Sequence, residues 1–225
     1  MKPFIQIIGD SGAGKTTLTG ELCKIFFLER LLGSGCFRLL GYKALLSGIQ
    51  NLENISPEFV KQILNNPAHT FEAVPREIYS ETYGFAAALV GGSHMVQEAI
   101  YESFIKSWLT TPFDGAIMDM AFRAVETPSK NKLARLTFKI ELLCDARIAS
   151  ERKWNDSQNA GKYMSKGEVR ESIEHRKHID YEGLDRTKYG KTFKINTSSL
   201  SIDEMTLSAV KIIMRRTTLR PIIGR

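Results

Sequence analysis

A glycine-rich stretch near the N-terminus constrains the fold of this chain more than any other feature of the sequence. Residues 9–17 read GDSGAGKTT and match the pattern G-x-x-x-x-G-K-[ST] in full. The apolar run Phe4–Ile8 precedes this loop and is typical of a buried strand, and apolar residues recur at helical spacing from Thr16 onward. In such a strand–loop–helix unit, the loop amides and the start of the helix together bind anions. The stretch therefore predicts a phosphate-binding loop in an α/β protein.

The residue types of this loop predict ATP and Mg²⁺ as its ligands. Its glycines permit backbone angles that a side chain would forbid, so the loop amides can point inward at phosphate oxygens. We expect Lys15 to contact the β- and γ-phosphates and to act in catalysis, and the Thr16 hydroxyl to bind Mg²⁺. The predicted ATP-binding residues are Gly9, Asp10, Ser11, Gly12, Ala13, Gly14, Lys15, Thr16 and Thr17.

A loop of this kind also needs a carboxylate near the metal ion, at the end of a neighbouring strand. Asp119 follows the short apolar run Ala116–Met118, which is itself a predicted strand. The sequence therefore predicts that Asp119 is catalytic and binds Mg²⁺ together with Thr16. The alternative is an ordinary polar residue at the end of a strand.

The segment 147–180 is polar, its basic residues outnumber its acidic ones, and we expect it to form a mobile lid. Small kinases exclude water from ATP during transfer, and arginines on a closing lid clamp phosphate oxygens. We expect Arg152 and Arg176 to be catalytic in this sense, with Arg147 and Arg170 as further candidates. The alternative is a solvent-exposed polar helix.

The remaining sequence alternates predicted strands with predicted helices. Further strands are expected at 138–143 and 193–195, and the segment 37–110 is expected to be mostly helical. This alternation is typical of a mostly parallel sheet with helices on both faces. With no repeat or linker in the sequence, we expect residues 1–225 to form one domain.

Local signals predict where the helices begin and end. The apolar spacing over 16–32 predicts a first helix that the glycines of 33–35 close. A Ser-Pro pair at 56–57 and capping-box patterns at 165–168 and 201–204 predict three helix starts. A stripe at helical spacing predicts a helix packed on the core: Val96, Ile100, Phe104 and Trp108.

In this order of elements and in several motifs, the chain resembles the bacterial-type cytidylate kinases, a branch of the nucleoside monophosphate kinases. The loop GDSGAGKTT is similar to the GPSGAGKGT of that family, and residues 195–205, INTSSLSIDEM, are similar to its last strand and helix start. Residues 76–108 and 161–176 resemble its helical segment and its lid helix. The resemblance implies a P-loop NTPase fold with a helical acceptor region and a lid. It also implies transfer of the ATP γ-phosphate to CMP or dCMP.

The same resemblance implies a set of acceptor-binding residues, although several family contacts are replaced. The implied acceptor-binding residues are Tyr42, Lys43, Arg123, Arg176 and Asp180. The replaced positions are Arg38, Ala88, Gln97 and Ala121. Each lost charge-assisted contact weakens binding by about 1.5–3 kcal/mol, so we expect CMP to be a weak substrate. A kinase of another small anionic metabolite or nucleoside is therefore an open alternative.

Composition bears on partners and location. The net charge is +6, but polyphosphate-binding proteins also need positive charge, and the sequence has no zinc-finger or RNA-binding signature. A second alternative is an ATP-binding regulatory or nucleic-acid-associated protein that uses the loop as a switch, and the basic tail with Arg215, Arg216, Arg220 and Arg225 supports it. We expect a cytoplasmic monomer with a small-molecule acceptor, no nucleic-acid partner and no membrane segment, because no apolar run approaches the length of a membrane span. Three scattered cysteines fit a reducing compartment as small buried apolar residues.

Overall fold

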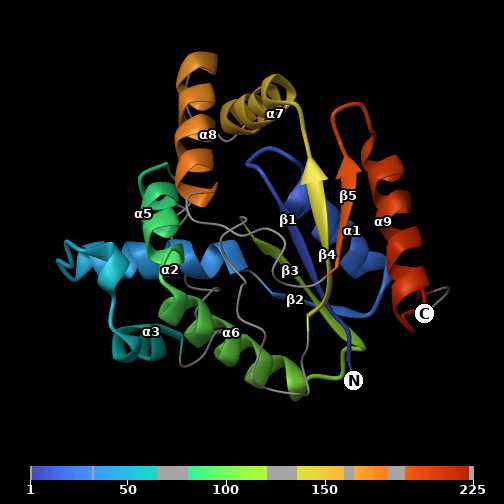
Figure 1. Ribbon diagram of the computed structural model, residues 1–225, viewed down its shortest axis with the longest axis horizontal. Coiled ribbons are helices and arrows are strands. Elements are labelled where there is room, and N and C mark those ends of the chain that lie inside the picture. The colour runs from blue at the N-terminus through green and yellow to red at the C-terminus, as the bar shows by residue number, and fades with distance from the viewer. Residues whose placement is uncertain are drawn as a thin grey trace.

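Five parallel strands form the centre of the protein, and helices cover both faces of the sheet (Figure 1). The computed structural model describes residues 2–31, 33–64, 81–120, 136–159, 165–181 and 191–222. The strands are β1 (Phe4–Gly9), β2 (Leu28–Leu31), β3 (Gly115–Met120), β4 (Leu136–Leu143) and β5 (Thr192–Asn196). Their order across the sheet is β2-β3-β1-β4-β5. Because the strands are parallel, their carboxyl ends meet at one edge, where α/β proteins bind ligands.

Strand β1 lies in the middle of the sheet, and its sequence FIQIIG is almost entirely apolar. All six of its residues are buried, and it pairs with β3 on one side and β4 on the other. A continuous buried run of this kind is typical of a strand covered on both faces. The position of β1 places the loop that follows it at the centre of the carboxyl edge.

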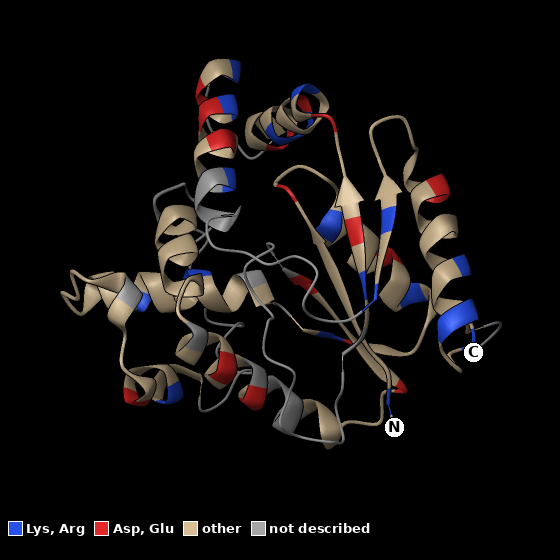
Figure 2. Ribbon diagram, viewed as in Figure 1, with Lys and Arg blue, Asp and Glu red and all other residues tan. Residues whose placement is uncertain are grey.

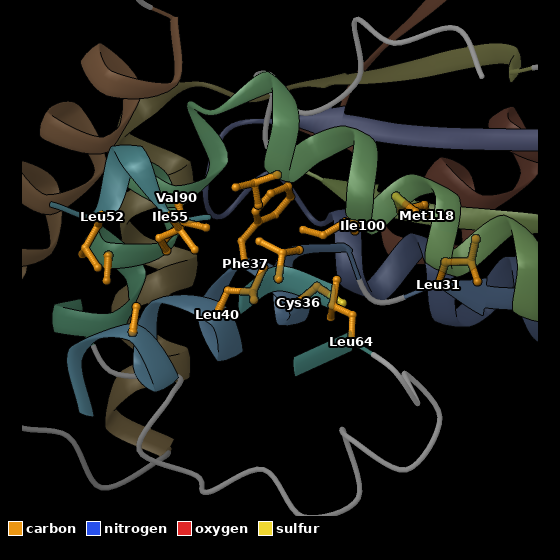
Figure 3. Packing of buried hydrophobic residues seen from close by; sticks show 14 of the residues in the cluster. Leu31, Cys36, Phe37, Leu40, Leu52, Ile55, Leu64, Val90, Ile100 and Met118 are labelled. Carbon is orange, nitrogen blue, oxygen red and sulfur yellow. The ribbon is translucent and has the colours of Figure 1, made fainter. Parts of the chain in front are cut away.

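The two faces of the sheet carry separate hydrophobic clusters, because successive side chains of a strand point to opposite faces. Ile5 and Ile7 pack with helices α1 (Lys15–Ile25) and α9 (Ile202–Arg216). Phe4 and Met118 pack on the other face with α2 (Gly33–Leu46), α3 (Pro57–Leu64), α5 (Glu81–Gly91) and α6 (His94–Leu109). Figure 3 shows the second cluster, where side chains from α2, α5 and α6 meet.

Two further helices, α7 (Ala146–Asn159) and α8 (Lys166–Tyr181), lie beyond the carboxyl ends of β4 and β5 (Figure 1). Lysine and arginine alternate with acidic residues along both helices (Figure 2). A hydrogen bond from Lys153 to Ser172 and the Lys166 ammonium over the ring of Trp154 connect the two helices, and Val169 and Ile173 of α8 are buried. The segment predicted as a lid thus contains two packed helices above the sheet edge.

The predicted helix starts are confirmed. The Ser56 hydroxyl caps α3, and Pro57 is its first residue. The Ser165 and Ser201 capping boxes open α8 and α9, with both reciprocal hydrogen bonds present. These hydrogen bonds hold the pKa values of Glu168 and Glu204 below their ordinary range.

The prediction for the first helix is wrong. Helix α1 ends at Ile25, β2 follows at Leu28–Leu31, and Gly33 opens α2 instead of closing α1. Phe26 turns the backbone into an extended conformation, and Leu28 and Leu31 are buried as β2 pairs with β3. The sequence did not predict this short strand, because its pairing with β3 is a contact between distant segments.

In the described residues, no helix is long and apolar enough to cross a membrane.

Candidate active site

The loop Gly9–Thr17 connects β1 to α1 at the carboxyl edge of the sheet. At Gly12 the φ angle is 82°, and an added Cβ would collide with the carbonyl oxygen of Ala149 in the first turn of α7. At Gly14 the backbone is left-handed, with φ 95° and ψ 15°, and this residue is the N-cap of α1. Only glycine adopts these conformations at low cost. The loop therefore owes its shape to these glycines and packs directly on α7.

Helix α1 starts without the side-chain cap that α8 and α9 have. Its N-cap is Gly14, which makes no side-chain cap hydrogen bond, and its first turn has no acidic residue. The first four amides of a helix lack partners within the helix, and the helix dipole adds positive potential there. An anion at the mouth of the loop would supply the missing acceptors.

Lys15 is the first residue of α1, and its side chain turns back over the loop. Its Nζ donates hydrogen bonds of 2.8 Å to the carbonyl oxygens of Gly9 and Asp10. These contacts hold an ammonium group at the rim of the loop, on the wall of the cleft described below. The loop thus carries a positive charge at its rim.

Thr16 and Asp119 meet across the gap between α1 and β3. The Thr16 hydroxyl donates to Asp119 Oδ2 at 2.8 Å. Asp119 is opposite Ile7 in the β3–β1 register and is only 2% exposed. Its second oxygen, Oδ1, is buried and has no hydrogen-bond partner. A buried carboxylate oxygen without a partner is costly, and a cation would remove this cost.

This pair fits a magnesium ion. Mg²⁺ is usually bound by one or two side-chain oxygens, by substrate phosphates and by water, instead of by a full protein cage. In the part of the chain that the structure describes, no cluster of three or more histidine, cysteine, aspartate or glutamate side chains is present. Thr16 and Asp119, the two residues that the sequence predicts for this role, would therefore be the protein's contribution.

Arg152 is held at the same edge by the end of β5. Its Nη2 donates to the carbonyl oxygen of Thr197 at 2.8 Å, and its Nη1 lies 3.5 Å from both Cys144 Sγ and Thr197 Oγ1. Arg152 also lines the cleft. A guanidinium fixed in this way is pre-organised, whereas the sequence suggested an arginine on a moving segment.

One cleft of about 570 Å³ joins these groups. Its size lies within the range of about 300–1,000 Å³ that is usual for small-molecule sites. The floor is formed by residues 9–12 and 14–17 and by Asp119. The walls are formed by α2 and α5 (Phe37, Arg38, Gly84, Ala87, Ala88, Gly91), by α7 and α8 (Arg152, Asp156, Ile173, Lys177), and by the segment after β5 (Thr197, Leu200, Ser201, Ile202, Met205).

Helix α8 bridges the two sides of this cleft. Lys177 Nζ lies 3.6 Å from Asp10 Oδ2 in the loop. On the other side, the ring of His175 stacks on Phe85 of α5, with centroids 5.4 Å apart and planes inclined by 14°. These two contacts place α8 over the opening between the loop and the α2–α5 wall.

Four other predicted residues lie outside the cleft. Tyr42 packs edge-on against Tyr83 of α5, and Lys43 is exposed; neither lines the cleft. Arg147 and Arg170 are likewise exposed and away from it, and Arg170 Nε bonds Glu174 at 3.1 Å.

Two groups of predicted positions remain, the further acceptor-binding residues and the replaced family contacts. Arg176 and Asp180 lie on α8, but their side chains are outside the described part of the structure, as are Ala121 and Arg123 altogether. Of the replaced family contacts, Arg38 and Ala88 line the cleft, whereas Gln97 is buried and donates to the Gly91 carbonyl oxygen.

Sequence reasoning missed several residues of the cleft. Phe37, Lys177, Asp156 and Thr197 line it, but no motif singled them out for this role. Thr197 lies in the stretch INTSS, whose resemblance to a family motif was the available signal. Lys177 is one basic residue among several on a polar helix, and only the packing of α8 selects it.

None of the three cysteines lines the cleft. All three are free thiols. Burial raises the pKa of Cys23 to about 11 and that of Cys36 well above its ordinary value. Both thiols are therefore protonated at neutral pH and poorly nucleophilic. Only Cys36 is buried as the sequence predicts, whereas Cys23 and Cys144 are partly exposed.

Comparisons with known proteins bear on the fold. No protein-family model matches the chain, and no curated protein matches it in sequence. The structure is similar to the crystal structure of TT1252 from Thermus thermophilus, with a TM-score of 0.51 and 15% identity over 96% of this chain and 98% of that one. It is also similar to an uncharacterized protein from Eubacterium ventriosum, with a TM-score of 0.47 and 15% identity over 96% of this chain and 100% of that one. The chain thus has an α/β fold with five parallel strands flanked by helices, and the likeness to TT1252 extends over nearly its whole length.

Proposed function

We propose that this protein is an ATP-dependent kinase with a P-loop and a cytidylate kinase-like arrangement, which transfers the γ-phosphate to a small anionic acceptor. One observation supports the proposal above the others. The glycine-rich loop, the Lys15 ammonium and the Thr16–Asp119 pair all face one cleft at the carboxyl edge of the sheet. These groups are the ones that phosphoryl transfer needs for positioning and for charge stabilisation.

The donor half of the proposed mechanism rests on the loop. Its amides and the uncapped start of α1 would bind the β- and γ-phosphates, and Lys15 would leave the two loop carbonyls to follow the transferring charge. Mg²⁺, held by Thr16 and Asp119, would supply charge neutralisation between the phosphates. Arg152 would add a fixed positive charge on the opposite wall.

The acceptor half would lie between the loop and the α2–α5 wall. This wall combines the Phe37 ring with the small residues Gly84, Ala87 and Ala88, so a flat molecule can lie against it. Arg38 and Lys177 bring positive charge to the same space. A nucleoside monophosphate, or another flat anion of that size, meets these requirements.

Arg38 and Lys43 provide a direct test of where the acceptor binds. Arg38→Ala is expected to raise the acceptor KM about 10-fold or more, since a hydrogen bond to a charged group contributes about 1.5–3 kcal/mol. Lys43→Ala is the matched control, because Lys43 is also on α2 but is exposed and outside the cleft. Steady-state kinetics at saturating ATP would measure both. A large effect of Lys43→Ala with none of Arg38→Ala would place the acceptor elsewhere.

Helix α8 is expected to become more protected when both substrates are bound. The Asp10–Lys177 pair and the Phe85–His175 stack attach its C-terminal half to the rest of the cleft. Helices with few buried contacts open readily, and substrates on both sides would add contacts. Hydrogen exchange of residues 165–181, with and without a non-hydrolysable ATP analogue plus CMP, measures this, with α9 as an internal reference. Equal exchange in both states would contradict a lid role.

The function itself is tested by an acceptor screen. ADP release from Mg²⁺–ATP would be followed with nucleoside monophosphates including CMP and dCMP, with nucleosides, and with small anionic metabolites. Acceptor-dependent ADP release that the Lys15→Ala variant lacks would support the kinase. ATP binding without any acceptor-dependent release would favour a regulatory ATP-binding protein. Turnover of CMP with a kcat/KM of about 10⁴ M⁻¹s⁻¹ or more would show that the altered acceptor contacts are replaced, not lost.

A further inference from the structure

Thr197, the residue that follows β5, connects two walls of the cleft. It is 1% exposed, and its hydroxyl donates to the carbonyl oxygen of Ala13 in the glycine-rich loop at 3.1 Å. Its own carbonyl oxygen accepts the 2.8 Å hydrogen bond from Arg152 Nη2. One residue therefore contacts both the phosphate-binding loop and the fixed guanidinium.

The hydroxyl proton of Thr197 has two neighbouring acceptors, and the geometry favours the loop. Thr197 Oγ1 also lies 3.2 Å from the carbonyl oxygen of Leu143. That oxygen already accepts the backbone amide of Thr197 at 2.7 Å. A hydroxyl has a single proton to donate, and the Ala13 oxygen is the nearer of its two acceptors.

This hydrogen bond fixes the peptide unit between Ala13 and Gly14. The unit is planar and trans, so its N–H points opposite to its C=O. With the Ala13 carbonyl directed at Thr197, the Gly14 amide is directed away from Thr197. Gly14 lines the cleft and has no side chain to hold its orientation. A donor fixed before binding costs no reorganisation when an anion arrives.

We propose that Thr197 is a positioning residue for the phosphates of the nucleotide. Its hydroxyl fixes the Ala13–Gly14 peptide, and its carbonyl fixes Arg152. The identity of the anion rests on the proposed function. A substitution that removes the hydroxyl removes its bond to Ala13 and its 3.5 Å contact with Arg152 Nη1, and it retains the 2.8 Å bond from Arg152 Nη2 to the Thr197 carbonyl oxygen.

The test compares ADP with adenosine, which has the same base and sugar but no phosphate. Thr197→Val removes the hydroxyl and keeps the branched shape, and Thr197→Ser restores the hydroxyl. Thr206→Val is the matched control, because Thr206 is also buried and its hydroxyl has no hydrogen-bond partner. Titration calorimetry with Mg²⁺ would give the ADP affinities, and adenosine would be titrated into the millimolar range.

We expect Thr197→Val to weaken ADP binding about 5- to 10-fold and to leave adenosine binding unchanged, as loss of one hydrogen bond of about 1 kcal/mol predicts. Thr197→Ser and Thr206→Val should bind ADP as the wild type does. If Thr197→Val does not fold, Thr197→Ala and Thr197→Ser form the same comparison, since they differ only in the hydroxyl. Wild-type ADP affinity in the valine or alanine variant, or equal losses for ADP and adenosine, would overturn the inference alone. A wild-type protein that binds no ADP would overturn the proposed function with it.

Discussion

Replacing Lys15 by alanine is expected to abolish phosphoryl transfer and to leave the fold intact. In the proposed reaction, Lys15 follows the charge that develops on the transferring phosphate, so its contribution is larger in the transition state than in the ground state. Loss of one such donor commonly lowers kcat by about 10²- to 10³-fold. Its Nζ donates to the carbonyl oxygens of Gly9 and Asp10 in the loop, and Lys15 belongs to neither hydrophobic cluster. The melting temperature should therefore change little.

The control for this variant lies on the same helix. Lys24 is 71% exposed and pairs with Glu21 at 2.7 Å on the surface of α1. Lys24→Ala changes the charge of the protein by the same amount and should retain full activity. Lys15→Arg should not restore transfer, because a planar guanidinium does not replace a compact ammonium in a tight loop. Transfer by purified, folded Lys15→Ala at a rate near that of the wild type would refute the role given to Lys15.

The features predicted correctly from the sequence depend on local backbone chemistry. A serine three residues before a glutamate sets a helix start, and this pattern gave the starts of α8 and α9. The loop after β1 was predictable for the same reason, since its glycines, lysine and threonine act within nine consecutive residues. Thr16 and Asp119 were paired correctly because parallel strands end at one edge.

The features that were missed depend on contacts between distant segments. Strand β2 has only four residues, and its register with β3 is what buries Leu28 and Leu31. The resemblance pointed to Lys43, whereas the cleft wall carries Arg38. Five residues correspond to about 140° around a helix, so the packing of α2 against α5 decides which of the two faces the cleft.

The roles of α8 and Thr197 also follow from tertiary packing. Lys177 reaches Asp10 because α8 packs against α5 and α7, through the His175–Phe85 stack and the Lys153–Ser172 hydrogen bond among other contacts. Thr197 reaches Ala13 only because β5 ends beside the loop. Nothing in the neighbourhood of these residues in the sequence indicates such partners. Charge and hydrogen-bonding capacity are visible in the sequence, but their direction is not.

Asp119→Asn is expected to separate activity from stability. The carboxylate of Asp119 is almost fully buried, and its Oδ1 has no partner in the structure. Removal of an uncompensated buried charge should leave the free energy of unfolding unchanged or raise it when Mg²⁺ and nucleotide are absent. Binding sites commonly carry such a cost, which the ligand then relieves.

The same substitution should lower phosphoryl transfer about 10²-fold or more, because a neutral amide holds Mg²⁺ poorly and charge neutralisation contributes several kcal/mol. The Mg²⁺ concentration needed for half-maximal rate should rise as well. Asp114→Asn is the matched control, since Asp114 is exposed just before β3 and is outside the cleft. Kinetics over a range of Mg²⁺ concentrations, together with thermal unfolding without ligands, would measure both effects. Asp119→Asn with wild-type Mg²⁺ dependence would remove Asp119 from the metal site, and a strongly destabilised variant would show that its carboxylate serves the fold instead.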